Sequence, residues 1–211
     1  MTDLPILWSF RRCPYAMRAR LAIRSSGIQV ALREILLRDK PAQFLATSPK
    51  ATVPVLDTDQ EVLEESRDIM IWALSRSDPD GWLDMPPEGH TLIDMCDGPF
   101  KTALDHTKYA VRFPDLDEAE EREKALTFLR TLNDRLSDTR FLMGPRRTLA
   151  DMAILPFVRQ FANTDRAWFD GCGLGPLTAW LDDFLESDAF AAIMPKYPPW
   201  QEGQDGVLFP A

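Results

Sequence analysis

The sequence predicts an α/β domain followed by an all-α domain, and two observations support this prediction. Residues 5–76 alternate short apolar runs with stretches of helical spacing, in the order βαβ-α-ββα. After a turn-rich segment, the apolar residues follow helical spacing throughout. We therefore expect an α/β domain at 1–76, a linker at 77–89 and a helical domain at 90–194. A tail at 195–211 is expected to be irregular and to pack on the body.

Each element of the first domain has its own signal. The run from Pro5 to Phe10 is short, apolar and bounded by breakers, which is typical of a buried strand. Pro14 is favoured at the first position of a helix, and Gly27 is typical of a helix end. Ser66 is expected to cap the last helix of this domain. The other expected elements are strands at 30–37, 53–56 and 62–64 and a short helix or turn at 41–48.

In the helical domain, one pattern combines a start signal with an apolar run. Thr148 and Asp151 have the spacing of a capping box, with aspartate in place of the usual glutamate. The helix that follows is apolar on most faces and should be buried. Further helices are expected at 90–112, either continuous or interrupted near Gly98–Pro99, at 116–138, and as one or two helices over 174–193. In the tail, Tyr197, Trp200, Leu208 and Phe209 would form an exposed apolar surface unless they packed back.

Composition and charge exclude several classes of function. The chain has 211 residues, 45% of them hydrophobic and 27% charged, and a net charge of −9 at pH 7. This acidic balance argues against binding to nucleic acid or to an anionic membrane, because either calls for a basic face. No apolar run approaches the ~20 residues of a membrane span, and the N-terminus lacks the pattern of a signal peptide. We expect no nucleic acid or membrane partner.

The cysteines and histidines bear on the cellular compartment of the protein and on whether it binds a metal. The three cysteines, Cys13, Cys96 and Cys172, are odd in number and widely separated. This indicates a reducing compartment, and so a cytoplasmic location, rather than a disulfide scaffold. The only histidines are His90 and His106, and no Cys-x-x-Cys motif occurs. We therefore expect no metal site.

Cys13 is the cysteine in a chemically active setting. It follows the first strand and precedes Pro14 at a helix start, where free backbone N–H groups and the helix dipole stabilise a thiolate. Its pKa should therefore fall below the free value of ~8.5. Arg11, Arg12 and Arg18 add positive charge nearby. The alternative is a buried, inert cysteine at a helix start, and structural roles are what we expect for Cys96 and Cys172.

The segment around Cys13 is part of a longer pattern. The sequence contains Phe10-Arg11-Arg12-Cys13-Pro14-Tyr15-Ala16, then Val53-Pro54-Val55-Leu56, then Glu64-Glu65-Ser66. In order and spacing, these motifs resemble the thioredoxin-type half of glutathione transferases, above all the cysteine-type members, the omega class and its bacterial relatives. The linker and the capping box resemble the helical half of that family. The resemblance implies a thioredoxin-like domain with a mixed four-stranded sheet, followed by an all-α domain.

The resemblance also assigns roles to residues of this chain. Val53 and Pro54 match a loop with a cis proline, whose backbone pairs with the cysteinyl unit of glutathione. Glu65 matches the acidic residue that holds the ammonium group, and Ser66 matches the helix start that receives the γ-glutamyl carboxylate. Lys40 lies where omega-like members place a lysine for the glycine carboxylate. Taken singly, these residues are equally consistent with an edge strand, a helix cap or a solvated lysine.

A cysteine in this position implies thiol transfer with glutathione as co-substrate. Cys13 would attack a glutathionyl mixed disulfide, and a second glutathione would release glutathione disulfide. Ala16 stands where dithiol glutaredoxins carry their second cysteine, so the mechanism should need only one thiol. The second substrate, a small electrophile or disulfide, is expected against the first helix of the second domain. The candidates there are Phe100, Leu104, Lys108, Tyr109 and Arg112.

Two other functions are compatible with the same residues. One is a two-domain, glutaredoxin-like reductase of protein mixed disulfides, which differs in its partner rather than in its first chemical step. The other is a non-catalytic binding or scaffold protein that keeps the fold, because a fold does not imply a function. The presence of Cys13, Glu65 and Ser66 together speaks against the scaffold. The family resemblance also implies a homodimer.

Overall fold

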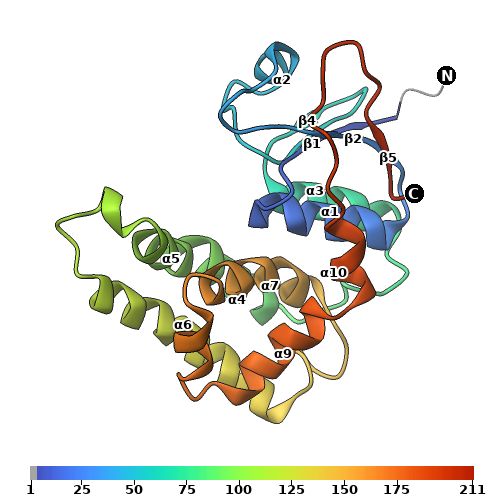
Figure 1. Ribbon diagram of the computed structural model, residues 1–211. Helices are drawn as coiled ribbons and strands as arrows, with labels where there is room; N and C mark the ends of the chain where they lie inside the picture. Colours follow the sequence, from blue (N-terminus) through green and yellow to red (C-terminus); the bar gives the residue numbers. More distant parts are fainter. Residues whose placement is uncertain (1–3) are drawn as a thin grey trace. The chain divides into compact units, whose positions relative to one another are not determined.

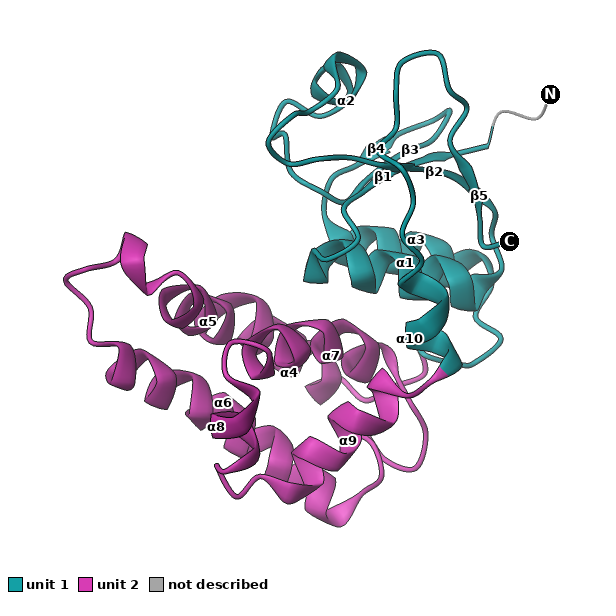
Figure 2. Ribbon diagram, in the orientation of Figure 1, with its two compact units in different colours: residues 1–83, 188–211 teal, residues 84–187 magenta. Residues whose placement is uncertain are grey.

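A computed structural model describes residues 4–211, and the chain divides into two units (Figure 2). Unit 1 comprises the residues up to 83 together with 188–211, and unit 2 comprises 84–187. The sequence-based boundaries differ from this division, because they assign 188–194 to the helical domain. Helix α10 (Asp188–Ile193) instead packs on α1 (Pro14–Ser26), with Ile193 buried.

Unit 1 contains a mixed sheet of five strands rather than the four predicted. The strands are β1 (Ile6–Ser9), β2 (Val30–Glu34), β3 (Val55–Asp57), β4 (Val62–Leu63) and β5 (Val207–Phe209), in the order β4-β3-β1-β2-β5. In the part of the sheet that the structure describes, β1 and β2 pair in parallel and the other three pairs are antiparallel. The fifth strand comes from the tail and pairs Phe209 with Val30 and Val207 with Leu32. It hydrogen-bonds the outer edge of β2, whose backbone groups would otherwise be unpaired.

Helices α1 and α3 (Ser66–Arg76) cover one face of this sheet, and helix α2 (Ala42–Thr47) and the tail lie on the other face (Figure 1). Helices α1 and α3 lie side by side on the first face. On the second face, the Trp8 ring lies 5.5 Å from that of Phe44 in α2 and 5.1 Å from that of Trp200 in the tail, measured between centroids. The tail is not irregular throughout, because it contains β5. Trp200 and Phe209 of the tail are buried, while Leu208 is exposed.

Gly206 turns the tail into β5, and its replacement by alanine should destabilise unit 1. Its φ is +100°, and an added Cβ would lie 3.1 Å from the carbonyl oxygen of Leu32. We expect Gly206→Ala to lower the free energy of unfolding by about 2 kcal/mol, from backbone strain and the close approach. Urea denaturation measures this loss. Gly203→Ala is the matched control, because its φ is +86° but nothing lies within 4 Å of the added Cβ. Equal losses for both variants would contradict the close approach.

Unit 2 is helical. Its α-helices are α4 (Glu88–Met95), α5 (Lys101–Lys108), α6 (Glu118–Asp138), α7 (Leu149–Ala162), α8 (Arg166–Asp170) and α9 (Gly175–Leu185). A π-helical turn (Cys96–Phe100) joins α4 to α5. It contains Gly98 and Pro99, where the sequence is compatible with either a continuous or an interrupted helix. Pro99 has no N–H for the regular helical ladder, which accounts for the local change of hydrogen bonding. Among the described residues, no helix is long and apolar enough to cross a membrane.

The predicted capping box at the start of α7 is confirmed. The Asp151 carboxylate accepts hydrogen bonds from the Thr148 backbone N–H at 2.9 Å and from the Thr148 hydroxyl at 3.0 Å. It also accepts from the Leu142 N–H at 2.9 Å and the Trp180 indole N–H at 3.1 Å. Burial raises the pKa of Asp151, and these donors act against that shift. Asp151 therefore joins α7 to the preceding loop and to α9.

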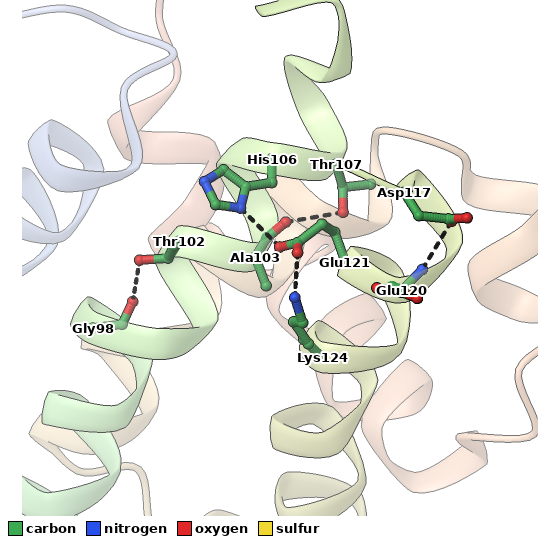
Figure 3. Close-up of polar contacts among 9 residues, drawn as sticks. All are labelled: Gly98, Thr102, Ala103, His106, Thr107, Asp117, Glu120, Glu121 and Lys124. Carbon is green, nitrogen blue, oxygen red and sulfur yellow. Dashed lines mark hydrogen bonds and ion pairs between the residues drawn. The ribbon is translucent and has the colours of Figure 1, made fainter. Parts of the chain in front are cut away.

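A second polar cluster joins α5 to α6 (Figure 3). Glu121 of α6 is 4% exposed, and its carboxylate contacts His106 Nδ1 at 2.8 Å and Lys124 Nζ at 2.5 Å. The hydrogen bonds from Lys124 and His106 lower the pKa of Glu121. A carboxyl group whose pKa is lowered by folding stabilises the fold above its ordinary value, and this contribution disappears as the pH falls through the lowered value.

Replacing Glu121 should therefore cost stability in a pH-dependent way. We expect Glu121→Gln to lower the free energy of unfolding by about 1 kcal/mol near pH 7, through loss of the charged hydrogen bonds. The difference from wild type should close as the pH falls through the lowered pKa of Glu121, because the wild-type carboxylate is then itself protonated. Denaturant titrations at several pH values measure this. Glu123→Gln, which removes an exposed ion pair with Arg130, should show a smaller loss. A gap for Glu121→Gln that persists unchanged in acid would contradict the electrostatic explanation.

Candidate functional site

A cavity of about 480 Å³ in unit 1 brings together Cys13 and all five residues predicted to bind glutathione. It is lined by Cys13, Tyr15, Leu37, Lys40, Ala51, Thr52, Val53, Pro54, Glu64, Glu65 and Ser66. A second cavity of about 500 Å³ is lined by residues of 35–43 and 198–202 and contains no cysteine. Because Cys13, the predicted nucleophile, and several charged residues meet in the first cavity, we take it as the candidate active site.

Cys13 stands at the start of α1 in the way the sequence predicts. It is the N-cap residue, with φ −72° and ψ 123°, and its carbonyl accepts the first helical hydrogen bond from Met17 at 2.9 Å. Its N–H donates to the Phe10 carbonyl at 3.0 Å, which closes a tight turn. The side chain is half-buried, and Sγ lies 3.6 Å from the carbonyl oxygen of Val53. The thiol is therefore at the positive end of a helix and open to the cavity.

The other two cysteines have different surroundings. Cys96 is fully buried in unit 2. Cys172 is half-buried, its thiol lies 3.3 Å from the Trp168 carbonyl, and burial raises its pKa. A raised pKa leaves less thiolate at neutral pH, so Cys172 is less reactive than a free cysteine.

The segment facing Cys13 has an unusual backbone. The Val53–Pro54 peptide bond is cis, as the resemblance implies, and both side chains are buried. Two residues earlier, Ala51 has a φ of +55°, in the left-handed region that non-glycine residues seldom occupy. Such conformations are frequent at functional sites. This segment presents the backbone of Val53 toward Cys13.

Ser66 is the first residue of α3 rather than its N-cap, so the helix begins one residue earlier than predicted. Glu65 is the N-cap, with φ −101° and ψ 128°, so Ser66 is the first helical residue. The Ser66 hydroxyl oxygen accepts a hydrogen bond from Arg18 Nε at 2.9 Å, and both residues are buried. Arg18, which the sequence suggested only as a nearby charge, thereby fixes the hydroxyl. The proton of the Ser66 hydroxyl can then be donated to an anionic ligand at the start of the helix.

Charged residues surround the rim of the cavity. Glu65 is exposed and accepts a hydrogen bond from Lys50 at 3.0 Å, and Glu64 lies 3.8 Å from the same ammonium group. These contacts raise the pKa of Lys50. Lys50 is not among the predicted site residues, although it stands only three residues before Val53. Lys40 is half-buried and also lines the cavity.

The five residues predicted for the second substrate all lie in unit 2, and two of them are unsuitable. Phe100 and Leu104 are 1% and 0% exposed, and the Phe100 ring packs on those of Phe128 and Phe161. Their role is core packing, so for these two residues the prediction is wrong. Lys108 and Arg112 are exposed, and both cations lie over the half-buried ring of Tyr109. A role in substrate binding stays a prediction for these three.

Comparison with known proteins identifies the family. Residues 7–80 match the family model for the glutathione S-transferase N-terminal domain, and residues 117–202 match that for the C-terminal domain. Together these matches span most of the chain. The chain belongs to the glutathione transferase superfamily.

Similar proteins support this membership. Protein IN2-1 of Zea mays is 31% identical over 188 residues, which cover 85% of this chain and 75% of that protein. Glutathione S-transferase DHAR3, chloroplastic, of Arabidopsis thaliana is 27% identical over 146 residues, or 68% of this chain. That match spans only 53% of the Arabidopsis protein. In fold, glutathione transferase Omega 3C from Trametes versicolor superposes with a TM-score of 0.77 at 18% identity, covering 94% of this chain and 92% of that structure.

The polar groups that line the cavity indicate which kind of ligand it can hold. Within residues 4–211, no group of three or more His, Cys, Asp or Glu side chains is arranged to hold a metal ion. The cavity instead offers one thiol, a backbone segment, two carboxylates and a helix start with a serine. This donor set fits a peptide that carries both an ammonium group and carboxylates, as glutathione does.

Proposed function

We propose that the chain is a glutathione-dependent thiol transferase in which Cys13 is the single nucleophile. The observation that carries the proposal is the convergence of Cys13, Val53, Glu65 and Ser66 on one cavity. Superfamily membership and the similarity to a DHAR-type glutathione S-transferase support the use of glutathione. The substrate class is a small glutathionyl mixed disulfide or a related electrophile.

The geometry suggests how the residues divide the work. The N–H and C=O of Val53 would pair with the cysteinyl unit of glutathione, as a neighbouring strand does. Ser66, fixed by Arg18, would receive the γ-glutamyl carboxylate at the start of α3. Glu65 would exchange its contact with Lys50 for one with the glutathione ammonium group. Lys40 would bind the glycine carboxylate.

The reaction requires two exchanges at one sulfur. In the first, the Cys13 thiolate attacks the glutathionyl sulfur of the mixed disulfide, and a Cys13–glutathione disulfide forms as the substrate disulfide breaks. The substrate leaves as a thiolate and takes up a proton. In the second, Cys13 is released as a thiolate when a second glutathione thiolate attacks its mixed disulfide, giving glutathione disulfide. Overall, the mixed disulfide and one glutathione give the substrate thiol and glutathione disulfide: the substrate sulfur is reduced by one electron and the sulfur of the incoming glutathione is oxidised by one.

Intact mass spectrometry tests this proposal. Incubation with glutathione disulfide should add one glutathionyl group of ~305 Da, because one thiolate is reactive enough to exchange. Peptide mapping should place the group on Cys13 and leave Cys96 and Cys172 unmodified. Reduced glutathione should then remove it. A stable adduct on Cys172, or none on Cys13, would refute the proposed nucleophile.

A further inference from the structure

Two ionisable side chains lie buried between the sheet and α1, beneath the turn that carries Cys13. Arg20 of α1 is 1% exposed and Glu34, the last residue of β2, is 8% exposed. Arg20 Nη1 lies 4.0 Å from Glu34 Oε2, which is too far for a hydrogen bond. Among the described residues, neither Arg20 Nε nor Glu34 Oε2 has a hydrogen-bond partner. A buried ion pair with incomplete hydrogen bonding is a poor source of stability.

Both side chains hold the same turn. Arg20 donates through Nη2 to the Arg11 carbonyl at 2.6 Å and through Nη1 to the Ser9 hydroxyl at 2.8 Å. Glu34 Oε1 accepts a hydrogen bond from the Arg11 backbone N–H at 2.6 Å. The N–H and the C=O of Arg11, two residues before Cys13, are thus both hydrogen-bonded to buried side chains. The position of the thiol depends on this support.

Arg20 and the thiol also interact electrostatically. Burial lowers the pKa of Arg20 to about 10, whereas the negative charges of Glu34, Cys13 and Tyr197 act to raise it. An interaction between two charges is shared equally, so Arg20 favours the Cys13 thiolate as much as the thiolate favours the Arg20 cation. Burial raises the pKa of Glu34. When its carboxylate is charged, a negative charge beneath the same turn opposes ionisation of the thiol.

We propose that Arg20 and Glu34 are positioning residues for Cys13. They hold the Phe10–Cys13 turn in place, and their opposite charges act in opposite directions on the ionisation of the Cys13 thiol. The inference rests on the proposed function in taking Cys13 as the nucleophile. Several other charged or titratable groups lie around the thiol. On the turn itself and in the tail they are Arg11, Arg12 and Tyr197, and around the cavity they are Tyr15, Lys40, Glu64 and Glu65.

The pH dependence of Cys13 alkylation by iodoacetamide tests the inference, followed peptide by peptide by mass spectrometry. Arg20→Met removes the positive charge and should raise the midpoint by about one pH unit. Glu34→Gln keeps an oxygen for the Arg11 N–H but removes the negative charge, and should lower the midpoint. Arg24→Met, on the same helix with a half-buried side chain, is the matched control and should leave the midpoint unchanged. Opposite shifts are not expected from loss of packing alone.

The double variant Arg20→Met/Glu34→Gln keeps the test decisive if Arg20→Met alone fails to fold. It contains no unpaired buried charge, and its midpoint should lie about one unit above that of Glu34→Gln. Unchanged midpoints in the folded variants would overturn the inference, even if glutathione turnover requires Cys13. Conversely, opposite shifts in a protein without glutathione-dependent turnover would uphold the inference and refute the proposed function.

Discussion

Cys13→Ser should lose glutathione-dependent reduction of a small mixed disulfide by roughly 10³-fold. A serine hydroxyl is not ionised at neutral pH and forms no disulfide, so neither exchange step can take place. Binding of glutathione should change little, because Val53, Glu65 and Ser66 provide the predicted contacts. Steady-state kinetics with the mixed disulfide measures the first effect, and calorimetry with glutathione measures the second.

Cys172→Ser is the matched control for this experiment. Cys172 is the other partly exposed cysteine, yet burial raises its pKa and it lies in unit 2. Its replacement should leave the rate within about twofold of wild type, because Cys172 does not line the cavity that contains Cys13. If Cys13→Ser retained full activity while Cys172→Ser lost it, the assignment of the nucleophile would be reversed. Glutathione binding without turnover in the wild type would favour the scaffold alternative.

Asp151→Ala should cost about 4 kcal/mol of the free energy of unfolding, enough to unfold much of unit 2 near physiological temperature. Asp151 is fully buried, and its two oxygens accept four hydrogen bonds from Leu142, Thr148 and Trp180. Alanine leaves all these buried donors without an acceptor. Urea denaturation followed by far-ultraviolet circular dichroism measures the loss in the helices.

Two further variants separate the causes of this loss. Asp151→Asn keeps one acceptor oxygen and should lose about half as much stability. Asp165→Ala removes the cap of α8, where the exposed carboxylate accepts a hydrogen bond from the Trp168 N–H at 3.0 Å. It should cost about 1 kcal/mol. Equal losses for Asp151→Ala and Asp165→Ala would show that capping alone explains the role of Asp151.

Local signals predicted much of unit 1. Pro14 and Gly27 mark the two ends of α1, and the structure has Gly27 at φ +71° as the C-cap. These signals act between residues close in the chain, so they can be read without a fold. The pairing of Val207–Phe209 with β2 could not be predicted in this way, because it depends on an edge that forms only when the sheet assembles.

The site shows the same division between local and distant effects. Motif spacing was enough to suggest that Cys13, Val53 and Ser66 belong together. It gave no sign of the hydrogen bond from Arg18 to Ser66, because that contact joins two helices distant in sequence. Phe100 and Leu104 were predicted at a substrate site but lie in the core, because an apolar residue of a helix can face a cleft or a core and the sequence does not distinguish the two.

The course of the chain through unit 1 has a consequence for its synthesis. Strands β1 to β4 are made before unit 2, whereas β5 is made after it. A ribosome therefore exposes β2 with an open edge throughout the synthesis of the helices, a state in which strands can pair with other chains. The helical unit can fold while the sheet is unfinished. Pairing of Val30 with Phe209, across so long a stretch of sequence, belongs among the late events of folding.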